Sequence, residues 1–436
     1  MVNARVVFGI ILLIGAFLAA ASAYTTWQKL RLSEEYNELG LKAMEDGDYD
    51  KAIEYFTMAI DVNPSYAIAY YNRGNAYGNE EQFHRYYKLP GQTFVEAGFP
   101  EMQEKYESAL RDFEKSMELD KNLVALAEFG IGNINFLYYC GYENREKEVL
   151  PHYFKALENK DKILAYSGKE GLAALYANIA RTYLAMAELD RAYEYYKMSI
   201  ETFPIDTAYE HLAWVEVELG NFEDAYKIAR DYLKHEDWET DLGLMPAAIS
   251  AYHLGKFDEA ERYCMEIIEK FPDSAYLGEA HRILALIYQL EGKHDMFLKE
   301  LEEDVEVCSE VIKNPEVVGD LPGAYYERGV AYFLLGKFND SIEDFKWIIE
   351  NPRITKREVA HENYYLEAHV GLACAYSKIG KFDESLKVLG KISTEIENPE
   401  FKGWKKLVGN LIEKLRKEIS KGASVDIPLM FSELSH

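Results

Sequence analysis

Cysteine and histidine side chains are the first candidates for metal or nucleophilic chemistry in this 436-residue sequence. The four cysteines, Cys140, Cys264, Cys308 and Cys374, are scattered and form no Cys-x-x-Cys pair. The histidines occur singly, without a His-Glu-x-x-His pattern. Zinc sites are recognised in a sequence by such closely spaced ligands. We therefore predict no metal site and expect the cysteines to be small buried apolar groups.

Motifs for nucleotide binding and acyl transfer are also missing from the sequence. Residues Phe129 to Asn133, FGIGN, resemble part of a dinucleotide-binding loop, but they lie within a helical pattern rather than after a strand. No Gly-x-Ser-x-Gly motif or phosphate loop occurs, and no pair of carboxylates stands out among the many Glu and Asp residues. The sequence therefore predicts that the chain is not an enzyme and needs no cofactor.

The overall charge restricts the classes of partner. The 75 acidic and 48 basic residues give a formal net charge of −27, which repels the phosphate backbone of nucleic acids. The exception is the segment from Phe401 to Lys421, with seven basic and two acidic residues and hence a local net charge of +5. We interpret it as the solvated face of a final helix. No nucleic-acid partner is predicted.

The elements that must position the side chains are helices. The sequence is rich in Tyr, Ala, Glu, Lys and Leu and contains only 12 Pro, which favours helices over strands. We therefore predict an all-α chain.

An apolar run lies near the N-terminal end of the sequence. Residues 6–23, VVFGIILLIGAFLAAASA, would span about 27 Å as a helix, close to the roughly 30 Å hydrocarbon core of a bilayer. Tyr24, Trp27, Lys29 and Arg31 follow in the order of an interfacial belt. We predict that residues 1–27 form one hydrophobic N-terminal helix, which anchors the chain by a single pass through residues 6–23 and leaves its bulk extracytoplasmic.

A cleaved secretory signal is the alternative for this run. Arg5 supplies a basic leader, and Ala21-Ser22-Ala23 has the small-x-small pattern of a signal peptidase site. Cleavage near Ala23 would give a secreted or periplasmic protein. Basic residues flank the run almost equally, so they decide the membrane orientation only weakly.

A period of 34 residues organises the rest of the sequence. In the segment Tyr36 to Pro64, small residues at Ala43, Ala52 and Ala59 keep fixed offsets from the aromatic residues, and the same offsets recur from Tyr176 onward through three consecutive copies. These segments resemble the tetratricopeptide repeat, a helix-turn-helix unit in which small residues let the two helices approach closely. The resemblance implies a right-handed superhelical solenoid.

The copies divide residues 33–399 into about nine units. The units are 33–66, 67–121 with an insertion at about 79–101, a degenerate unit at 122–165, 173–206, 207–240, 241–274, a degenerate unit at 278–312, 322–355 and 366–399. An apolar stripe from Trp404 to Ile419 predicts a capping helix at 400–421, since a solenoid needs one to cover its last interface. Residues 422–436 show no periodicity and predict a flexible tail.

Several units share the turn sequence Gly-Lys-Phe or Gly-Asn-Phe. Glycine accepts the left-handed conformation that ends the first helix, and the aromatic residue pins the second helix onto it. We expect this conformation at Gly220, Gly255, Gly336 and Gly380.

The insertion at 79–101 separates two helices that otherwise match the repeat. We expect the first helix to continue to about Lys88, a loop from Leu89 to Phe99, and a second helix from about Pro100. The resulting hairpin would protrude beyond its neighbours. Its aromatic residues, which either pack on the third unit or bind a partner, are Phe83, Tyr86, Tyr87, Phe94 and Phe99.

The resemblance also predicts where a partner would bind, because the first helices of successive units line the concave face of such arrays. On this chain the predicted protein-binding groove contains Asn72, Asn75, Asn178, Arg181, Trp214, Met245, Tyr252, Tyr326 and Phe333. One subgroup of the family uses Lys and Arg in these helices to clamp the acidic C-termini of heat-shock chaperones. The equivalent positions here hold Asn37, Leu41, Val124 and Glu128, and only Asn72 and Asn75 agree with that pattern.

Acidic residues on the same face suggest the charge of the partner. Glu38, Glu128, Glu210 and Glu327 are interspersed among the groove positions, so we expect a neutral or basic, partly apolar protein or peptide. The sequence predicts a noncatalytic scaffold or adaptor, tethered at a membrane, that mediates protein interaction or complex assembly. The alternatives are a self-associating structural component of the cell envelope and a secreted or periplasmic peptide-binding protein. The sequence leaves the oligomeric state open.

Overall fold

The computed structural model of the chain is described for residues 4–79, 100–139, 144–234, 240–313, 321–352, 363–398 and 401–427. These residues fold mainly into helices. The side chains of residues 4–7, 9–11, 406 and 407 are also outside the description. No strand occurs among the described residues, and the prediction of an all-helical repeat array is confirmed. The chain divides into an N-terminal unit, residues 1–138 and 151–166, and a C-terminal unit, residues 139–150 and 167–436.

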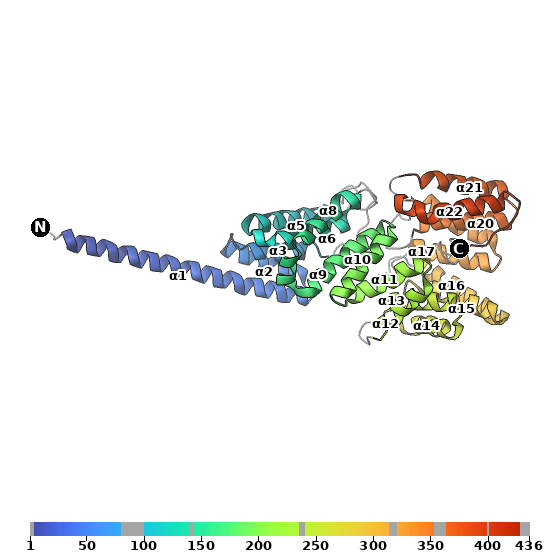
Figure 1. Cartoon of the computed structure of the whole chain (residues 1–436), viewed down its shortest axis with the longest axis horizontal. Coiled ribbons are helices and arrows are strands. Elements are labelled where there is room, and N and C mark those ends of the chain that lie inside the picture. Colours follow the sequence, from blue (N-terminus) through green and yellow to red (C-terminus); the bar gives the residue numbers. More distant parts are fainter. Residues whose placement is uncertain are drawn as a thin grey trace. The chain divides into compact units, whose positions relative to one another are not determined.

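The N-terminal unit is built from helices in which α1 pairs with α2 and α3 pairs with α5 (Figure 1). Its elements are α1 (Ala4–Glu45), α2 (Tyr49–Val62), α3 (Ala67–Tyr77), α5 (Pro100–Leu119), η1 (Lys121–Leu123), α6 (Val124–Tyr138), most of α8 (Leu150–Glu158) and the first part of α9 (Lys160–Ala185). Helix α9 is interrupted at Gly168, where φ is 66°.

Helix α1 is continuous from the apolar run into the first repeat. The N-terminal helix therefore does not end at residue 27, the predicted boundary of the anchor, but continues to Glu45. The stretch after Trp27 contains no Gly or Pro up to Gly40, and Arg31 pairs with Glu35 at 2.8 Å one turn further on, so nothing ends the helix there.

The N-terminal half of α1 extends beyond the other helices of its unit (Figure 1). Its large apolar side chains are exposed, with Phe8, Leu13 and Phe17 at 64%, 72% and 74%. Within the described residues, no helix combines the length and the apolar character needed to cross a membrane, so the structure gives the predicted anchor no support. The side chains of residues 4–7 and 9–11 belong to the same run and lie outside the described residues.

The C-terminal unit continues the alternation of first and second helices (Figure 1). From α10 onward, each helix contacts the next one along the chain. Its elements are η2 (Arg145–Val149), the second part of α9, α10 (Leu189–Thr202), α11 (Asp206–Glu218), α12 (Phe222–Tyr232), α13 (Asp241–His253), α14 (Phe257–Lys270), α15 (Leu277–Leu290), α16 (His294–Lys313), α17 (Leu321–Leu334), α18 (Phe338–Glu350), α20 (Tyr364–Lys378), α21 (Phe382–Glu395) and α22 (Lys402–Ile419).

The predicted turn chemistry is confirmed. Gly220, Gly255, Gly336 and Gly380 have φ values of 76°, 70°, 73° and 76°, in the left-handed region that favours glycine. The turn between α9 and α10 uses the same conformation without a glycine, because Ala187 occupies it with φ 55°.

Close approach between helices depends on aromatic residues of the second helices. Phe345 of α18 is fully buried between two first helices, and a Cβ atom at Gly329 or Gly371 would lie only 2.9 or 2.6 Å from its ring. Phe113 of α5 has the same relation to Gly74 and Gly130. In these two places the glycines of neighbouring first helices thus provide space for one aromatic ring.

The inserted segment begins after a helix that is shorter than expected. Helix α3 ends at Tyr77, with Gly78 as its C-cap, so the predicted continuation to Lys88 is wrong. A Cβ atom at Gly78 would lie 2.2 Å from the Ile134 side chain, which shows how closely α6 approaches this end. The predicted start of the second helix at Pro100 is confirmed. Residues 80–99 lie outside the described residues, so the predicted loop remains a prediction.

Helix α22 covers the end of the array as predicted. Its stripe of Trp404, Val408, Leu411, Leu415 and Ile419 is buried. The start of α22 also contacts the turn after α9, since a Cβ atom at Gly403 would lie 1.8 Å from the Met186 carbonyl oxygen. The last helix of the C-terminal unit therefore also packs against its first turn.

Candidate protein-interaction surface

The first helices of the C-terminal unit form a continuous row. Helix α11 contacts α13, α13 contacts α15, α15 contacts α17, and α17 contacts α20, in addition to the contacts with their second helices. Helices that contact each other across an intervening helix lie on the inner side of a curved array. This row is the surface on which a repeat array of this kind can hold an extended partner.

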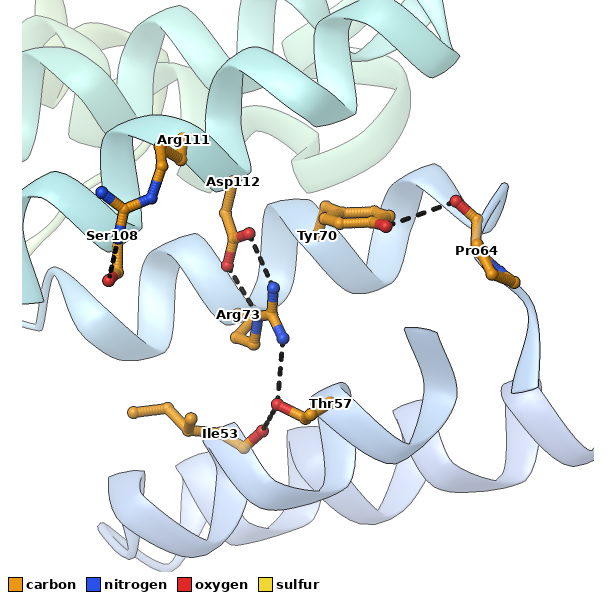
Figure 2. Close-up of polar contacts among 8 residues, drawn as sticks. All are labelled: Ile53, Thr57, Pro64, Tyr70, Arg73, Ser108, Arg111 and Asp112. Atoms are coloured by element: carbon orange, nitrogen blue, oxygen red, sulfur yellow. Dashed lines mark hydrogen bonds and ion pairs between the residues drawn. The ribbon is translucent and has the colours of Figure 1, made fainter. Parts of the chain in front are cut away.

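An arginine in α3 fixes the first helix of the second unit. The Arg73 guanidinium donates two hydrogen bonds to the Asp112 carboxylate in α5, at 2.7 and 2.8 Å, and a third to Thr57 Oγ1 in α2, at 3.0 Å. Figure 2 shows Arg73 between these two partners. One side chain thus connects a first helix to its own second helix and to the preceding second helix, and this contact sets how the units stack.

Arg328 makes the equivalent three contacts in the C-terminal unit. Its guanidinium donates to Asp344 at 2.9 and 2.7 Å and to Ser309 Oγ of the preceding second helix at 3.2 Å. The paired residues are 39 positions apart in the first case and 16 in the second. The difference of 23 positions equals the expected length of the insertion, so the inserted residues leave the contact between the two helices intact.

Five of the nine predicted groove residues are buried within the chain. Trp214 donates its indole N–H to the Leu242 carbonyl at 3.1 Å, and Phe333 packs edge-on against Phe338. The prediction that these five line an open groove is wrong, because large first-helix side chains fill the space between neighbouring units. The five are Asn72, Trp214, Met245, Tyr326 and Phe333.

The remaining predicted groove residues, Asn75, Asn178, Arg181 and Tyr252, are half-buried. They lie on α3, on the second part of α9 and on α13. Their role as contacts for a partner remains a prediction. The predicted hairpin residues Phe83, Tyr86, Tyr87, Phe94 and Phe99 lie outside the described residues.

Two of the four acidic residues that were expected to set the charge of the groove are engaged within the chain. Glu128 is 7% exposed and lies 2.5 Å from the Nδ1 atom of His152. Glu210 accepts hydrogen bonds from the hydroxyl groups of Tyr232 and Thr240, both at 2.6 Å, and burial raises its pKa. The hydrogen-bonding capacity of these two carboxylates is thus already used within the chain.

A buried charged cluster joins α15, α16 and α17. Arg282 pairs with Glu279 at 2.9 Å and with Glu327 at 3.1 Å. Cys308 Sγ donates to Asp304 Oδ1 at 3.3 Å, and burial raises the pKa of both groups well above the usual range. A reactive cysteine needs the opposite shift, so Cys308 lacks this feature of a reactive thiol.

The described residues contain no group of three or more His, Cys, Asp or Glu side chains that could hold a metal ion. Cys264, Cys308 and Cys374 are free and buried, which confirms the prediction for these three. Cys140 lies outside the described residues.

An extended segment after α22 contacts α20, and sequence reasoning missed it. Val425 and Ile427 pack against the apolar core that α20 and α22 share. The Val425 N–H donates to Ser377 Oγ at 3.0 Å. The prediction of a flexible tail from residue 422 is therefore wrong for these residues, whereas residues 428–436 lie outside the described residues. The alternating apolar positions 423, 425 and 427 were the available signal.

Family profiles match three segments of the chain. A profile described as TPR repeat matches residues 40–80, and two described as tetratricopeptide repeat match residues 173–205 and 247–274. These matches and the helical fold confirm that the chain contains tetratricopeptide repeats.

The chain is similar to a TPR repeat-containing protein of Methanocaldococcus jannaschii, with 22% identity over 88% of this chain and 74% of that protein. Among solved structures it is similar to a Pyrococcus horikoshii signal transduction ATPase with a tetratricopeptide repeat sensor, with 18% identity over 89% of this chain and 55% of that one and a TM-score of 0.45. It is also similar to yeast Tom70, with 16% identity over 94% of each chain and a TM-score of 0.41. TM-scores of 0.41 and 0.45 support no conclusion about the function of this chain.

Proposed function

We propose that the tetratricopeptide repeats of this chain form a noncatalytic scaffold that holds an extended segment of another protein along its row of first helices. The observation that carries the proposal is the continuous contact from α11 to α20, kept in register by the Arg328 contacts to two second helices. A continuous row of helices presents a long surface, which suits the assembly of protein complexes.

The internal partners of Glu128 and Glu210 bear on the expected chemistry of the bound segment. These two carboxylates are engaged within the chain, so they are less available to a bound segment than the sequence suggested. The bound segment is neutral or basic and partly apolar, because Glu38 of the same face stays exposed.

Site-specific photo-crosslinking tests the scaffold. A photoreactive phenylalanine analogue replaces Tyr252 on the first helix α13 in one protein and Lys227, which is exposed on the second helix α12, in a control protein. Crosslinking in native membranes should give discrete adducts from position 252 and none from position 227. Equal adducts from both positions, or none from position 252, contradict the proposal.

The exposed half of α1 supports a membrane tether as the second part of the proposal. Phe8, Leu13 and Phe17 are all more than 60% exposed, and Tyr24 stacks on Trp27 at the end of the run. Burying such side chains in a bilayer is favourable by about 1.5 to 3 kcal/mol each. An exposed apolar surface of this size on a helix marks a site of contact with a membrane or another protein, and a bilayer would cover it.

Flotation with phospholipid vesicles tests the tether on the full chain. Wild-type protein should float with the vesicles, and a Leu13→Glu/Phe17→Glu variant should remain in solution. N-terminal sequencing of the mature protein addresses the alternative, because a new terminus at or near Tyr24 would mean signal cleavage instead of a tether.

A further inference from the structure

The segment after α22 has the alternation of an extended peptide lying on a surface. Ala423, Val425 and Ile427 are half-buried, whereas Ser424 and Asp426 are exposed. Successive side chains of an extended chain point to opposite sides, so one edge of the segment faces α20 and the other faces water.

Two side chains of α20 recognise the main chain of this segment. Ser377 Oγ accepts the Val425 N–H at 3.0 Å and donates its own proton to the Cys374 carbonyl at 2.7 Å. Cys374 Sγ–H donates to the Asp426 carbonyl at 3.4 Å. Recognition through main-chain groups is independent of the side chains that the segment carries, as in other extended peptides bound on protein surfaces.

A basic side chain adds a charge preference at the same place. The Lys378 ammonium group forms an ion pair with the Asp426 carboxylate. It also lies 5.6 Å from the centre of the Phe333 ring on the neighbouring first helix α17. The site therefore accepts aliphatic side chains at the positions of Val425 and Ile427 and a carboxylate between them, at the position of Asp426.

The contact can exchange because little of it is buried. The Asp426 side chain is 82% exposed, and an ion pair so close to water contributes little. Val425 and Ile427 are only half-buried. A covalently attached segment nevertheless has a high effective concentration, so it can occupy a site that it binds weakly.

We propose that Cys374, Ser377 and Lys378 of α20 form a peptide-binding site for an extended aliphatic-acidic-aliphatic segment, and that residues 423–427 occupy it in cis. A partner with this chemistry must displace the chain's own segment. The proposal deepens the scaffold function, on which it rests, by naming the class of segment bound at the C-terminal end of the row.

Thiol labelling of the full chain tests the site, because Cys374 is fully buried next to the segment. The labelling rate at Cys374, read by peptide mass spectrometry, is compared between wild-type protein and a Val425→Asp/Ile427→Asp variant. We expect labelling at least ten times faster in the variant. Cys264, which is buried in a different part of the unit, should stay protected in both and serves as the folding control.

A synthetic peptide with the sequence of residues 422–429 then tests recognition in trans. It should slow the labelling of Cys374 in the opened variant in a concentration-dependent way, and the same peptide with Asp426→Lys should do so less, because its ammonium group would face that of Lys378. Asp426→Lys in the full chain is a second, milder opening variant, since this side chain is exposed.

Two results would overturn the proposal. Equal Cys374 labelling in wild-type and both opened proteins would show that the segment does not cover the site. Labelling that the peptide leaves unchanged would show that the site binds no segment of this chemistry. Neither result depends on the crosslinks at position 252, so failure of this site and failure of the scaffold function can be distinguished.

Discussion

Arg73 and Asp112 face each other as a bidentate pair although 39 positions and the whole inserted segment separate them in sequence. The same pair forms between Arg328 and Asp344, which are 16 positions apart. Both arginines also bond a hydroxyl group of the preceding second helix. The repeat therefore keeps its polar contact between helices whether or not residues are inserted between them.

Replacing Arg73 with Ala should lower the free energy of unfolding by about 3 kcal/mol, because it leaves the nearly buried Asp112 without its partner. Arg73→Lys should recover only part of the loss, since one ammonium group cannot bond both carboxylate oxygens and Thr57. Chemical denaturation measures each value. If the Arg73→Ala/Asp112→Ala double variant loses the sum of the two single losses, the residues are not coupled.

Replacing residues 82–98 by a Gly/Ser segment of equal length should leave the unfolding midpoint unchanged. Pro100 to Leu119 is held without it, because Tyr106 stacks on Tyr138 at 3.9 Å and Arg73 binds Asp112. Thermal unfolding and partner crosslinking are compared with wild type. Loss of stability would mean that the insertion packs on the array, and loss of crosslinks alone would identify it as a binding element.

Ala187→Gly should raise the free energy of unfolding by about 1 kcal/mol, because Ala187 has φ 55° and glycine adopts this conformation without strain. The matched control is Gly255→Ala, in the equivalent turn with φ 70°, which should lower stability by a similar amount. A change of the same sign in both variants would contradict the explanation by backbone strain.

Two glycines of α22 should respond oppositely to alanine. A Cβ atom at Gly403 would overlap the Met186 carbonyl oxygen, whereas a Cβ atom at Gly409 meets nothing within 4 Å. Gly403→Ala should therefore destabilise the protein by about 2 kcal/mol, and Gly409→Ala should stabilise it by about 0.5 to 1 kcal/mol. Denaturant titrations of both variants test the contact between α22 and the turn after α9. If Gly403→Ala is harmless, that contact is absent.

Stability should fall in mild acid in part because of His253. Burial lowers its pKa from 6.5 to about 4, and its ring stacks on Phe222 at 4.0 Å. Between pH 6.5 and about pH 4, His253 is protonated in the unfolded chain but stays neutral in the folded chain. The contribution of neutral His253 to the free energy of unfolding is therefore fully present above pH 6.5 and decreases as the pH falls.

The measurement is the unfolding midpoint from pH 8 to pH 4.5 for wild-type protein and for His253→Gln. The variant should lose less stability than wild type on acidification, whatever its stability at pH 8. Parallel curves for the two proteins would show that His253 does not contribute.

The sequence by itself determined the period of the repeat, the helix pairs and the turn glycines. These features depend on residues a few positions apart, because small residues at fixed offsets allow two neighbouring helices to pack and a left-handed turn requires glycine. The same local rules predicted the second helix from Pro100 and the buried stripe of α22.

Only the tertiary structure decided which first-helix side chains are open to a partner. Trp214 and Phe333 lie on the predicted face, but neighbouring units bury them. The contacts of Arg73 with Asp112, of Gly403 with the turn at Met186, and of the segment at Val425 with Ser377 join residues from 39 to more than 200 positions apart. The 34-residue period of the sequence does not predict such contacts. They depend on how whole helices stack on one another rather than on the order of residues within a single helix.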